Sequence, residues 1–133
     1  IYKYWMKDDK KDQSLSPDLI GLNLVNVGSD WLLDESSSTD ERTVLYYSKL
    51  LEEGKTSSLF ADSIKVDGIV ATRVTQVPVE GKPNTIRTVY DYDGMHFCVE
   101  VKVDAVQDHN AEDAIWSAWG SKVTVNDGTL QLK

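Results

Sequence analysis

Alternation of apolar and polar residues is the main periodic signal along this chain. The clearest run covers residues 95–107, where the apolar side chains on one face are Phe97, Val99, Val101, Val103 and Ala105. The opposite face carries polar residues such as His96, Glu100 and Lys102. Because successive side chains of a strand point to opposite faces, this pattern predicts a long β-strand with one buried face.

Shorter runs of the same kind predict further strands. They are separated by turn residues and cover residues 1–6, 22–27, 43–48, 69–79 and 85–92. Asp93-Gly94 is a hairpin signal that predicts pairing of 85–92 with 95–107, and Asn126-Asp127-Gly128 predicts a final hairpin. The polar stretch 28–42 is interpreted as a surface loop that Trp31 anchors.

One helix is predicted, over residues 111–118. Asn110 is the expected N-cap and Gly120 the expected C-terminal stop. Spacing of i, i+3, i+4 and i+7 gives the helix an apolar face made of Ala111, Ala114, Ile115 and Ala118. Many strands with one short helix near the C-terminus predict a mainly β fold, most simply a two-sheet antiparallel sandwich, as a single domain over 1–133.

Charge and cysteine content narrow the classes of partner. The 133 residues carry 14 Lys and Arg against 22 Asp and Glu, a net charge of −8. This acidity argues against nucleic acid and against anionic membrane surfaces. The single cysteine, Cys98, excludes an intrachain disulfide, and no apolar run reaches the roughly 18 residues of a membrane span. The chain starts at Ile1 instead of Met, so we expect a preceding segment to have been removed.

No motif supplies the residues of a catalytic or metal site. Gly54-Lys55-Thr56 resembles the end of a phosphate-binding loop, but the glycine required five positions earlier is Lys49. Asp91-Tyr92-Asp93-Gly94 resembles the start of a calcium loop, but the twelfth position is Lys102 instead of glutamate. The two histidines, separated by twelve residues, lack the spacing of zinc ligands. We therefore predict no catalytic, cofactor or metal residues, and a protein that is not an enzyme.

Aromatic residues at the N-terminus are the strongest candidate for a functional segment. Ile1, Tyr2, Tyr4 and Trp5 lie on both faces of the first predicted strand, and a charged loop over 7–14 follows. A strand that is apolar on both faces must be covered on both sides. The segment is either an assembly strand donated to a neighbouring molecule or an edge strand of its own domain.

A second candidate site consists of tryptophans. Trp31 and Trp116 are candidate binding aromatics, because an exposed indole ring can stack on a sugar. The alternative is that the tryptophans are core residues or loop anchors, since tryptophan is heavily buried on average. This candidate corresponds to a monomeric carbohydrate- or protein-binding β-sandwich module.

A pattern over roughly residues 31–119 resembles exported proteins of the TasA/camelysin kind. It consists of paired tyrosines at Tyr46-Tyr47, then Leu50, Gly54, Thr56 and Leu59-Phe60, with Trp31 upstream. Downstream, a strand ending in Ala105-Val106-Gln107 precedes a small helix that ends in Ala118-Trp119. Residues 1–30 depart from the family pattern, because they match neither its N-terminal signal nor the apolar strand that follows the signal.

The resemblance implies a jelly-roll sandwich in an extracellular or cell-wall-associated protein of Gram-positive bacteria. It also implies a structural role, in some members as fibre subunits joined by a strand that one subunit donates to the next. Camelysin-like members have been described as metalloproteases, but this chain has no residues for such a site. From the resemblance we expect a non-enzymatic surface or matrix protein that associates with itself or with another cell-surface protein.

Overall fold

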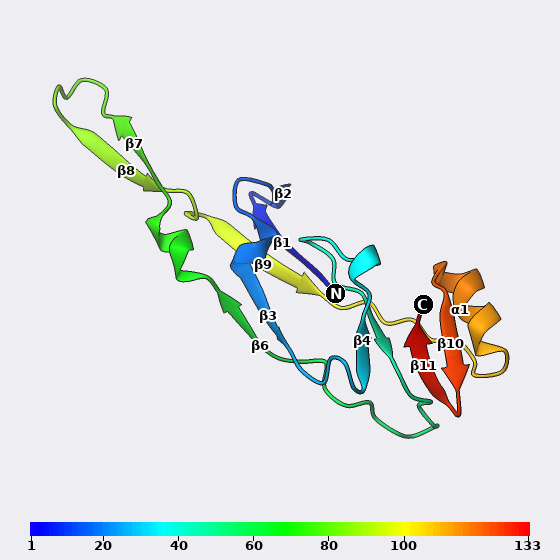
Figure 1. The fold of residues 1–133 in the computed structure, drawn as a ribbon. Helices are drawn as coiled ribbons and strands as arrows, with labels where there is room; N and C mark the ends of the chain where they lie inside the picture. Colours follow the sequence, from blue (N-terminus) through cyan, green and yellow to red (C-terminus); the bar gives the residue numbers. More distant parts are fainter.

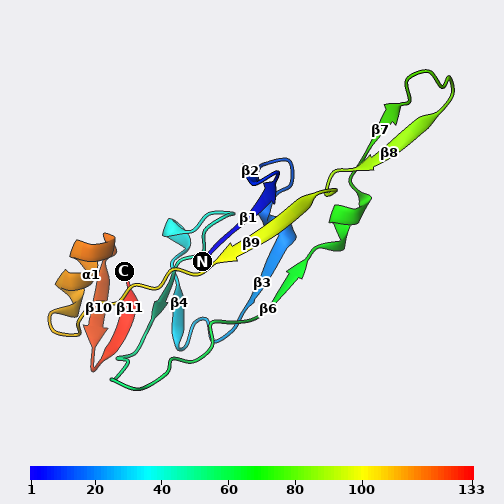
Figure 2. The same ribbon diagram turned by 180° about the vertical axis from the view of Figure 1, so that it is seen from behind.

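The computed structural model describes residues 1–133 and confirms the mainly β fold with one α-helix. Eleven strands form one three-stranded and four two-stranded sheets, and every pairing is antiparallel. The sheets follow one another along an elongated molecule, with a projecting hairpin at one end and the helix at the other (Figure 1). The same drawn-out shape is seen from behind (Figure 2).

The N-terminal strand is the middle strand of the largest sheet. β1 (Tyr2–Lys7) pairs on one side with β2 (Lys10–Asp12) and on the other with β9 (Met95–Glu100). Asp8 and Asp9 have φ angles of 51° and 59°. These values fit a two-residue hairpin turn, in which short polar residues tolerate the left-handed conformation. The region predicted as a charged loop over 7–14 thus contains a turn and the strand β2.

A small core joins this sheet to a second one. β3 (Ile20–Leu24) pairs with β6 (Ala61–Val66), and η1 (Pro17–Leu19) precedes β3. The buried cluster between these elements consists of Trp5, Leu15, Leu19, Ile20 and Val70, with Val66, Met95 and Val99 packed against it. Side chains far apart in sequence therefore meet at one place in the middle of the molecule.

The C-terminal part of the molecule forms around a third pair of strands. β4 (Trp31–Leu33) pairs with β5 (Leu45–Tyr47), and η2 (Glu35–Ser37) lies between them. Helix α1 (Ala111–Trp119) packs on the hairpin of β10 (Val123–Asn126) and β11 (Thr129–Leu132). The Leu130 amide donates to the Ser48 carbonyl at 2.7 Å, and the rings of Tyr46 and Trp119 lie 5.7 Å apart. These contacts attach the C-terminal unit to β5.

The remaining hairpin projects beyond the body. β7 (Val74–Pro78) pairs only with β8 (Ile86–Tyr90), and η3 (Gly68–Thr72) leads into it. Figure 1 shows this hairpin as a two-stranded ribbon at the far end from α1. We call residues 73–90 the arm.

Three strand predictions are wrong in their details. The predicted strand 69–79 begins as the 3-10 helix η3 and becomes a strand only at Val74. Asp93-Gly94 does form a turn, but β8 pairs with β7 and β9 pairs with β1, so the turn joins two strands that are not partners. The long predicted strand 95–107 ends at Glu100, and residues 101–107 belong to no strand. Trp31–Leu33, expected in a loop, instead forms β4.

The helix prediction is confirmed except for its cap and one face residue. Gly120 ends α1 with a φ of 69° and donates its amide to the Trp116 carbonyl, as expected. Asn110 adopts a left-handed conformation and its side chain makes no capping bond. Ile115 is buried, but Ala118 is exposed and Trp119 is half-buried in its place.

Candidate assembly site

Trp5 is the anchor of the N-terminal segment. Its side chain is only 4% exposed, and its indole nitrogen donates to the Ser16 carbonyl at 2.9 Å. Its ring meets Phe97 of β9 edge to face, with centroids 6.3 Å apart. A buried indole needs a hydrogen-bond partner, and here the loop before η1 provides it. This contact holds β1 against the body of its own chain.

The two tyrosines of the segment lie at the surface of the same sheet. The hydroxyl of Tyr4 donates to Glu100 Oε1 at 3.1 Å, and this hydrogen bond to a carboxylate raises the pKa of the phenol. The ring of Tyr2 lies 5.3 Å from Lys102 Nζ and 6.0 Å from the Arg42 guanidinium carbon. Both rings are half-buried and are held by charged neighbours at exposed sites.

Residues 1–3 also pair with residues 41–43, on the edge of β1 that faces away from β9. The Ile1 ammonium donates to the Thr43 carbonyl at 2.8 Å, and the Thr43 amide donates to the Ile1 carbonyl at the same distance. The Lys3 amide donates to Glu41, and Lys3 Nζ donates to the Ile20 carbonyl at 2.9 Å. Within a single chain, the candidate assembly segment Ile1, Tyr2, Tyr4 and Trp5 is thus paired on both sides.

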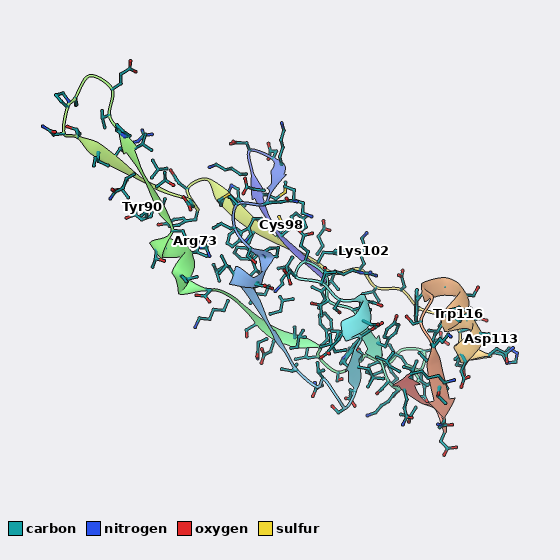
Figure 3. All side chains as sticks on the ribbon, turned by 45° about the horizontal axis from the view of Figure 1, so that its top comes forward. Arg73, Tyr90, Cys98, Lys102, Asp113 and Trp116 are labelled. Carbon is teal, nitrogen blue, oxygen red and sulfur yellow. The ribbon has the colours of Figure 1, made fainter.

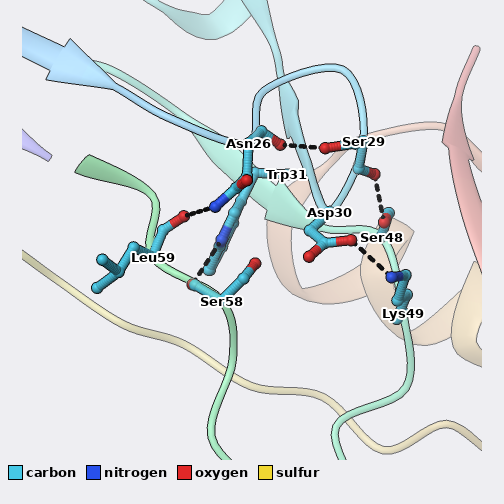
Figure 4. Close-up of polar contacts among 8 residues, drawn as sticks. All are labelled: Asn26, Ser29, Asp30, Trp31, Ser48, Lys49, Ser58 and Leu59. Atoms are coloured by element: carbon cyan, nitrogen blue, oxygen red, sulfur yellow. Dashed lines mark hydrogen bonds and ion pairs between the residues drawn. The ribbon is translucent and has the colours of Figure 1, made fainter. Parts of the chain in front are cut away.

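Trp31 anchors the chain around β4. Its indole nitrogen donates to the Ser58 carbonyl at 3.0 Å, and its ring packs on Tyr47 and Phe60 at centroid distances of 5.0 and 5.6 Å. The contacts around it are drawn in Figure 4, where Asp30 and Lys49 pair beside Trp31. Their oxygen and nitrogen lie 2.6 Å apart, and the Lys49 ammonium lowers the pKa of Asp30. Because both ring contacts are internal, Trp31 has the environment of a structural anchor.

Trp116 is the one tryptophan with a largely exposed ring. It is 53% exposed on the outer side of α1, and Lys122 Nζ lies 5.5 Å from its centroid. Figure 3 labels it at the helical end of the molecule. No aromatic contact joins Trp116 to Trp31, so the structure does not bring the two candidate binding aromatics together.

Two hollows in the surface are open to solvent. One is lined by residues of the Asp12–Pro17 loop with Asp40 and Glu41, the other by Asp18, Leu19, Gly21, Lys65, Asp67 and Gly68. A single hydrophobic residue lines each of them. No group of three or more His, Cys, Asp or Glu residues is placed to hold a metal ion. No helix has the length and apolarity that crossing a membrane requires.

Two features of the structure were not expected from the sequence as functional elements. One is the arm, whose strands pair only with each other. The other is the stretch 101–107, whose backbone makes no hydrogen bond and whose Val103 is 82% exposed. The alternation in 95–107 was a signal for the second, because it continues the strand pattern of β9 beyond Glu100, where the strand ends. We call residues 101–107 the open segment.

Comparisons with known proteins found no relative of this chain. No family model, no curated protein and no solved structure matches this chain.

Proposed function

We propose that this protein is a non-enzymatic structural subunit of an extracellular matrix, fibre or cell surface, which associates with further copies of itself by strand addition. The observation that carries the proposal is the amount of surface that the single chain leaves exposed. Its accessible surface is 9602 Å². A folded monomer of 14.9 kDa exposes about 7,000 Å². The excess, about 2,600 Å² per chain, is of the size that permanent protein assemblies bury.

The core is correspondingly small. Only 10 of the 133 residues are buried, and 8 of these are hydrophobic. Fifteen large hydrophobic residues are exposed instead, and they include Val74, Val77, Ile86 and Tyr90 of the arm and Val101 and Val103 of the open segment. An isolated two-stranded hairpin is marginally stable in water unless further strands or another element cover it. Covering these side chains with a second copy would supply the missing apolar burial.

A sandwich arrangement of the sheets is part of the same proposal. The sheet of β2, β1 and β9 shares its core cluster with β3 and with Val66 of β6, which is the packing expected where two sheets face each other. We propose that a jelly-roll-like sandwich is completed when strands from a neighbouring copy extend these short sheets. Strand addition suits this role because main-chain hydrogen bonds give affinity and alternate side chains give specificity.

The N-terminal strand takes part in assembly only if it exchanges between copies. β1 is paired on both sides within its own chain, and Trp5 is buried there. Deletion of residues 1–6 distinguishes the two roles. If the strand serves its own domain, the deletion destabilises the monomer. If it is exchanged, the truncated chain stays folded and monomeric, and the free 1–6 peptide restores the lost stability.

The extracellular or cell-wall location and the Gram-positive origin are further parts of the proposal, supported by the resemblance to TasA/camelysin proteins. A monomeric carbohydrate- or protein-binding module is the second candidate. The exposed ring of Trp116 favours it, because a tryptophan that is 53% exposed beside a lysine can stack on a ligand. If the protein is a binding module, the substitution Trp116→Ala should abolish ligand binding. If it is a self-associating subunit, the same substitution should leave self-association unchanged.

Sedimentation velocity across a wide concentration range tests the proposed function. We expect a series of growing species with rising concentration, and filaments or sheets by negative-stain electron microscopy. A single sharp monomer at every concentration would contradict the proposal and favour the binding module.

A further inference from the structure

The arm and the open segment lie apart in the molecule and have complementary properties. Figure 3 labels Arg73 and Tyr90 at the base of the arm, Lys102 in the open segment, and Asp113 and Trp116 at the opposite end from the arm. Both parts expose apolar side chains, and both have free backbone groups. The arm offers a paired strand with an open edge, and the open segment offers a stretch of backbone without a hydrogen-bond partner.

We propose that the arm of one copy adds the outer edge of β8 to the open segment of a second copy. This inference rests on the proposed function and names the two surfaces that carry it. The result is a three-stranded sheet made of β7, β8 and residues 101–107 of the neighbour. It satisfies backbone groups that the single chain leaves to water.

Backbone directions select β8 as the docking edge. The Val79 amide donates to the Thr85 carbonyl, and the Asp91 amide donates to the Arg73 carbonyl, so odd-numbered residues of both strands face each other. Because backbone groups alternate in direction along a strand, the amides of Ile86, Thr88 and Tyr90 face outward. On the outer edge of β7 the corresponding positions are Val74, Gln76 and Pro78, and Pro78 has no amide hydrogen. β8 alone offers an uninterrupted row of donors.

The distribution of charge favours a second copy of this chain as the partner of the arm. The arm has three basic residues, Arg73, Lys82 and Arg87, and one acidic residue, Glu80, which gives it a net charge of +2 in a chain of net charge −8. Residues 100–113, which include the open segment, have a net charge of −4, with Lys102 as the only basic residue against five acidic ones, Glu100, Asp104, Asp108, Glu112 and Asp113. Within residues 101–107 Lys102 balances Asp104, so the negative charge lies on the flanking residues. Its attraction to the basic arm draws copies of the same chain together and orients their encounter.

Position in the molecule sets the kind of assembly. The arm projects from one end, and the open segment leads from β9 towards α1 at the other end (Figure 1). An arm that docks on a different surface of the next copy makes a heterologous contact. Such contacts repeat head to tail, so an open assembly of any length has one free arm at one end and one free open segment at the other.

Matched proline variants test the docking edge. Thr88→Pro removes an outward amide from β8, whereas Gln76→Pro removes an outward amide from β7 of the same hairpin, and neither amide belongs to the β7–β8 ladder. We expect Thr88→Pro to remain monomeric in sedimentation at concentrations where the parent assembles, and Gln76→Pro to assemble like the parent. Equal assembly by both variants, or equal loss in both, would overturn the choice of the β8 edge.

Mixing two defective chains tests the receiving surface. The double variant Lys102→Pro, Val103→Pro removes two consecutive amides from the open segment, and neither amide makes a hydrogen bond within the chain. This chain retains its arm, and Thr88→Pro retains its open segment. Each should be monomeric alone, and an equimolar mixture should sediment as a dimer that does not grow. Failure of the mixture to form a dimer would overturn the inference.

The behaviour of the parent chain distinguishes a failure of this inference from a failure of the proposed function on which it rests. If the parent is monomeric under all conditions, both proposals fail. If the parent assembles and all three variants assemble with it, the protein is still a self-associating subunit, and only the pairing of β8 with the open segment is wrong.

Discussion

The indole nitrogen of Trp5 donates to the carbonyl oxygen of Ser16 at 2.9 Å, which ties the middle strand of the largest sheet to the loop before η1. Trp5 is also the largest residue of the five-residue core cluster. With so few buried residues in the whole chain, one side chain carries an unusual share of the stability. The expected effects of substitution follow from this uneven distribution.

Trp5→Ala should be among the most destabilising substitutions. It removes a nearly fully buried ring together with the indole hydrogen bond to the Ser16 carbonyl, which together cost about 3–5 kcal/mol of unfolding free energy. Urea denaturation followed by circular dichroism measures the loss. Trp116→Ala is the matched control, because that ring is more than half exposed, and it should change the unfolding free energy by less than about 0.5 kcal/mol. Similar losses in the two variants would contradict this assignment of the core.

Ile115→Ala should detach helix α1 from the C-terminal hairpin. Ile115 is 3% exposed and is the buried residue of α1, so its truncation should cost about 2–5 kcal/mol. Thermal unfolding monitored at 222 nm gives the comparison. Ala118→Ser on the exposed side of the same helix should leave the melting temperature nearly unchanged. A larger effect at position 118 would restore the apolar face that the i, i+7 spacing predicted.

Asp34 should make the fold sensitive to acid. Its carboxylate accepts hydrogen bonds from the hydroxyl of Ser36 at 2.6 Å and from the amide of Ser37 at 3.2 Å, and these bonds, the hydroxyl first, lower the pKa of Asp34. A carboxyl group whose pKa is lower in the folded chain than its unfolded value of about 3.9 stabilises the fold above that value. The stabilisation disappears as the pH falls through the lower, folded pKa.

Urea unfolding between about pH 6 and pH 2 measures this contribution. Asp34→Asn should be less stable than the parent at neutral pH and should lose stability less steeply in acid. Glu35→Gln is the control, because the Glu35 carboxylate makes no hydrogen bond, and it should retain the parent's slope. A parent-like slope in Asp34→Asn would show that this aspartate does not contribute to the acid transition.

The final hairpin should depend on one glycine. Asp127 and Gly128 have φ angles of 49° and 74°, the pair of left-handed conformations that a tight two-residue hairpin turn requires. Gly128→Ala should therefore cost about 1 kcal/mol in thermal unfolding, although nothing lies within 4 Å of the added carbon. Gly68→Ala also meets no neighbour but has no positive φ, and it should be neutral or slightly stabilising. Equal effects at both positions would exclude the backbone explanation.

Local features of the fold were predictable because they depend on neighbouring residues. Aromatic and β-branched residues at 1–6 predict β1, and the Asn126-Asp127-Gly128 run predicts the turn between β10 and β11. Gly120 predicts the end of α1, since glycine adopts a positive φ without steric cost. The face of α1 was less predictable, because Tyr46, a residue distant in sequence, decides that Trp119 packs against the body.

For the candidate site too, some features depend on neighbouring residues and others on residues that are distant in sequence. The sequence by itself determined that 1–6 is an aromatic strand and that 95–107 alternates, because both are properties of consecutive residues. Only the tertiary structure decided that β1 lies between β2 and β9 and that the backbone of residues 101–107 has no hydrogen-bond partner within the chain. Backbone hydrogen-bonding groups are the same in every strand, so a local pattern predicts a strand without naming its partner. The partner is chosen by side chains that meet across the fold, such as Trp5 and Phe97, and those meetings exist only once the chain has folded.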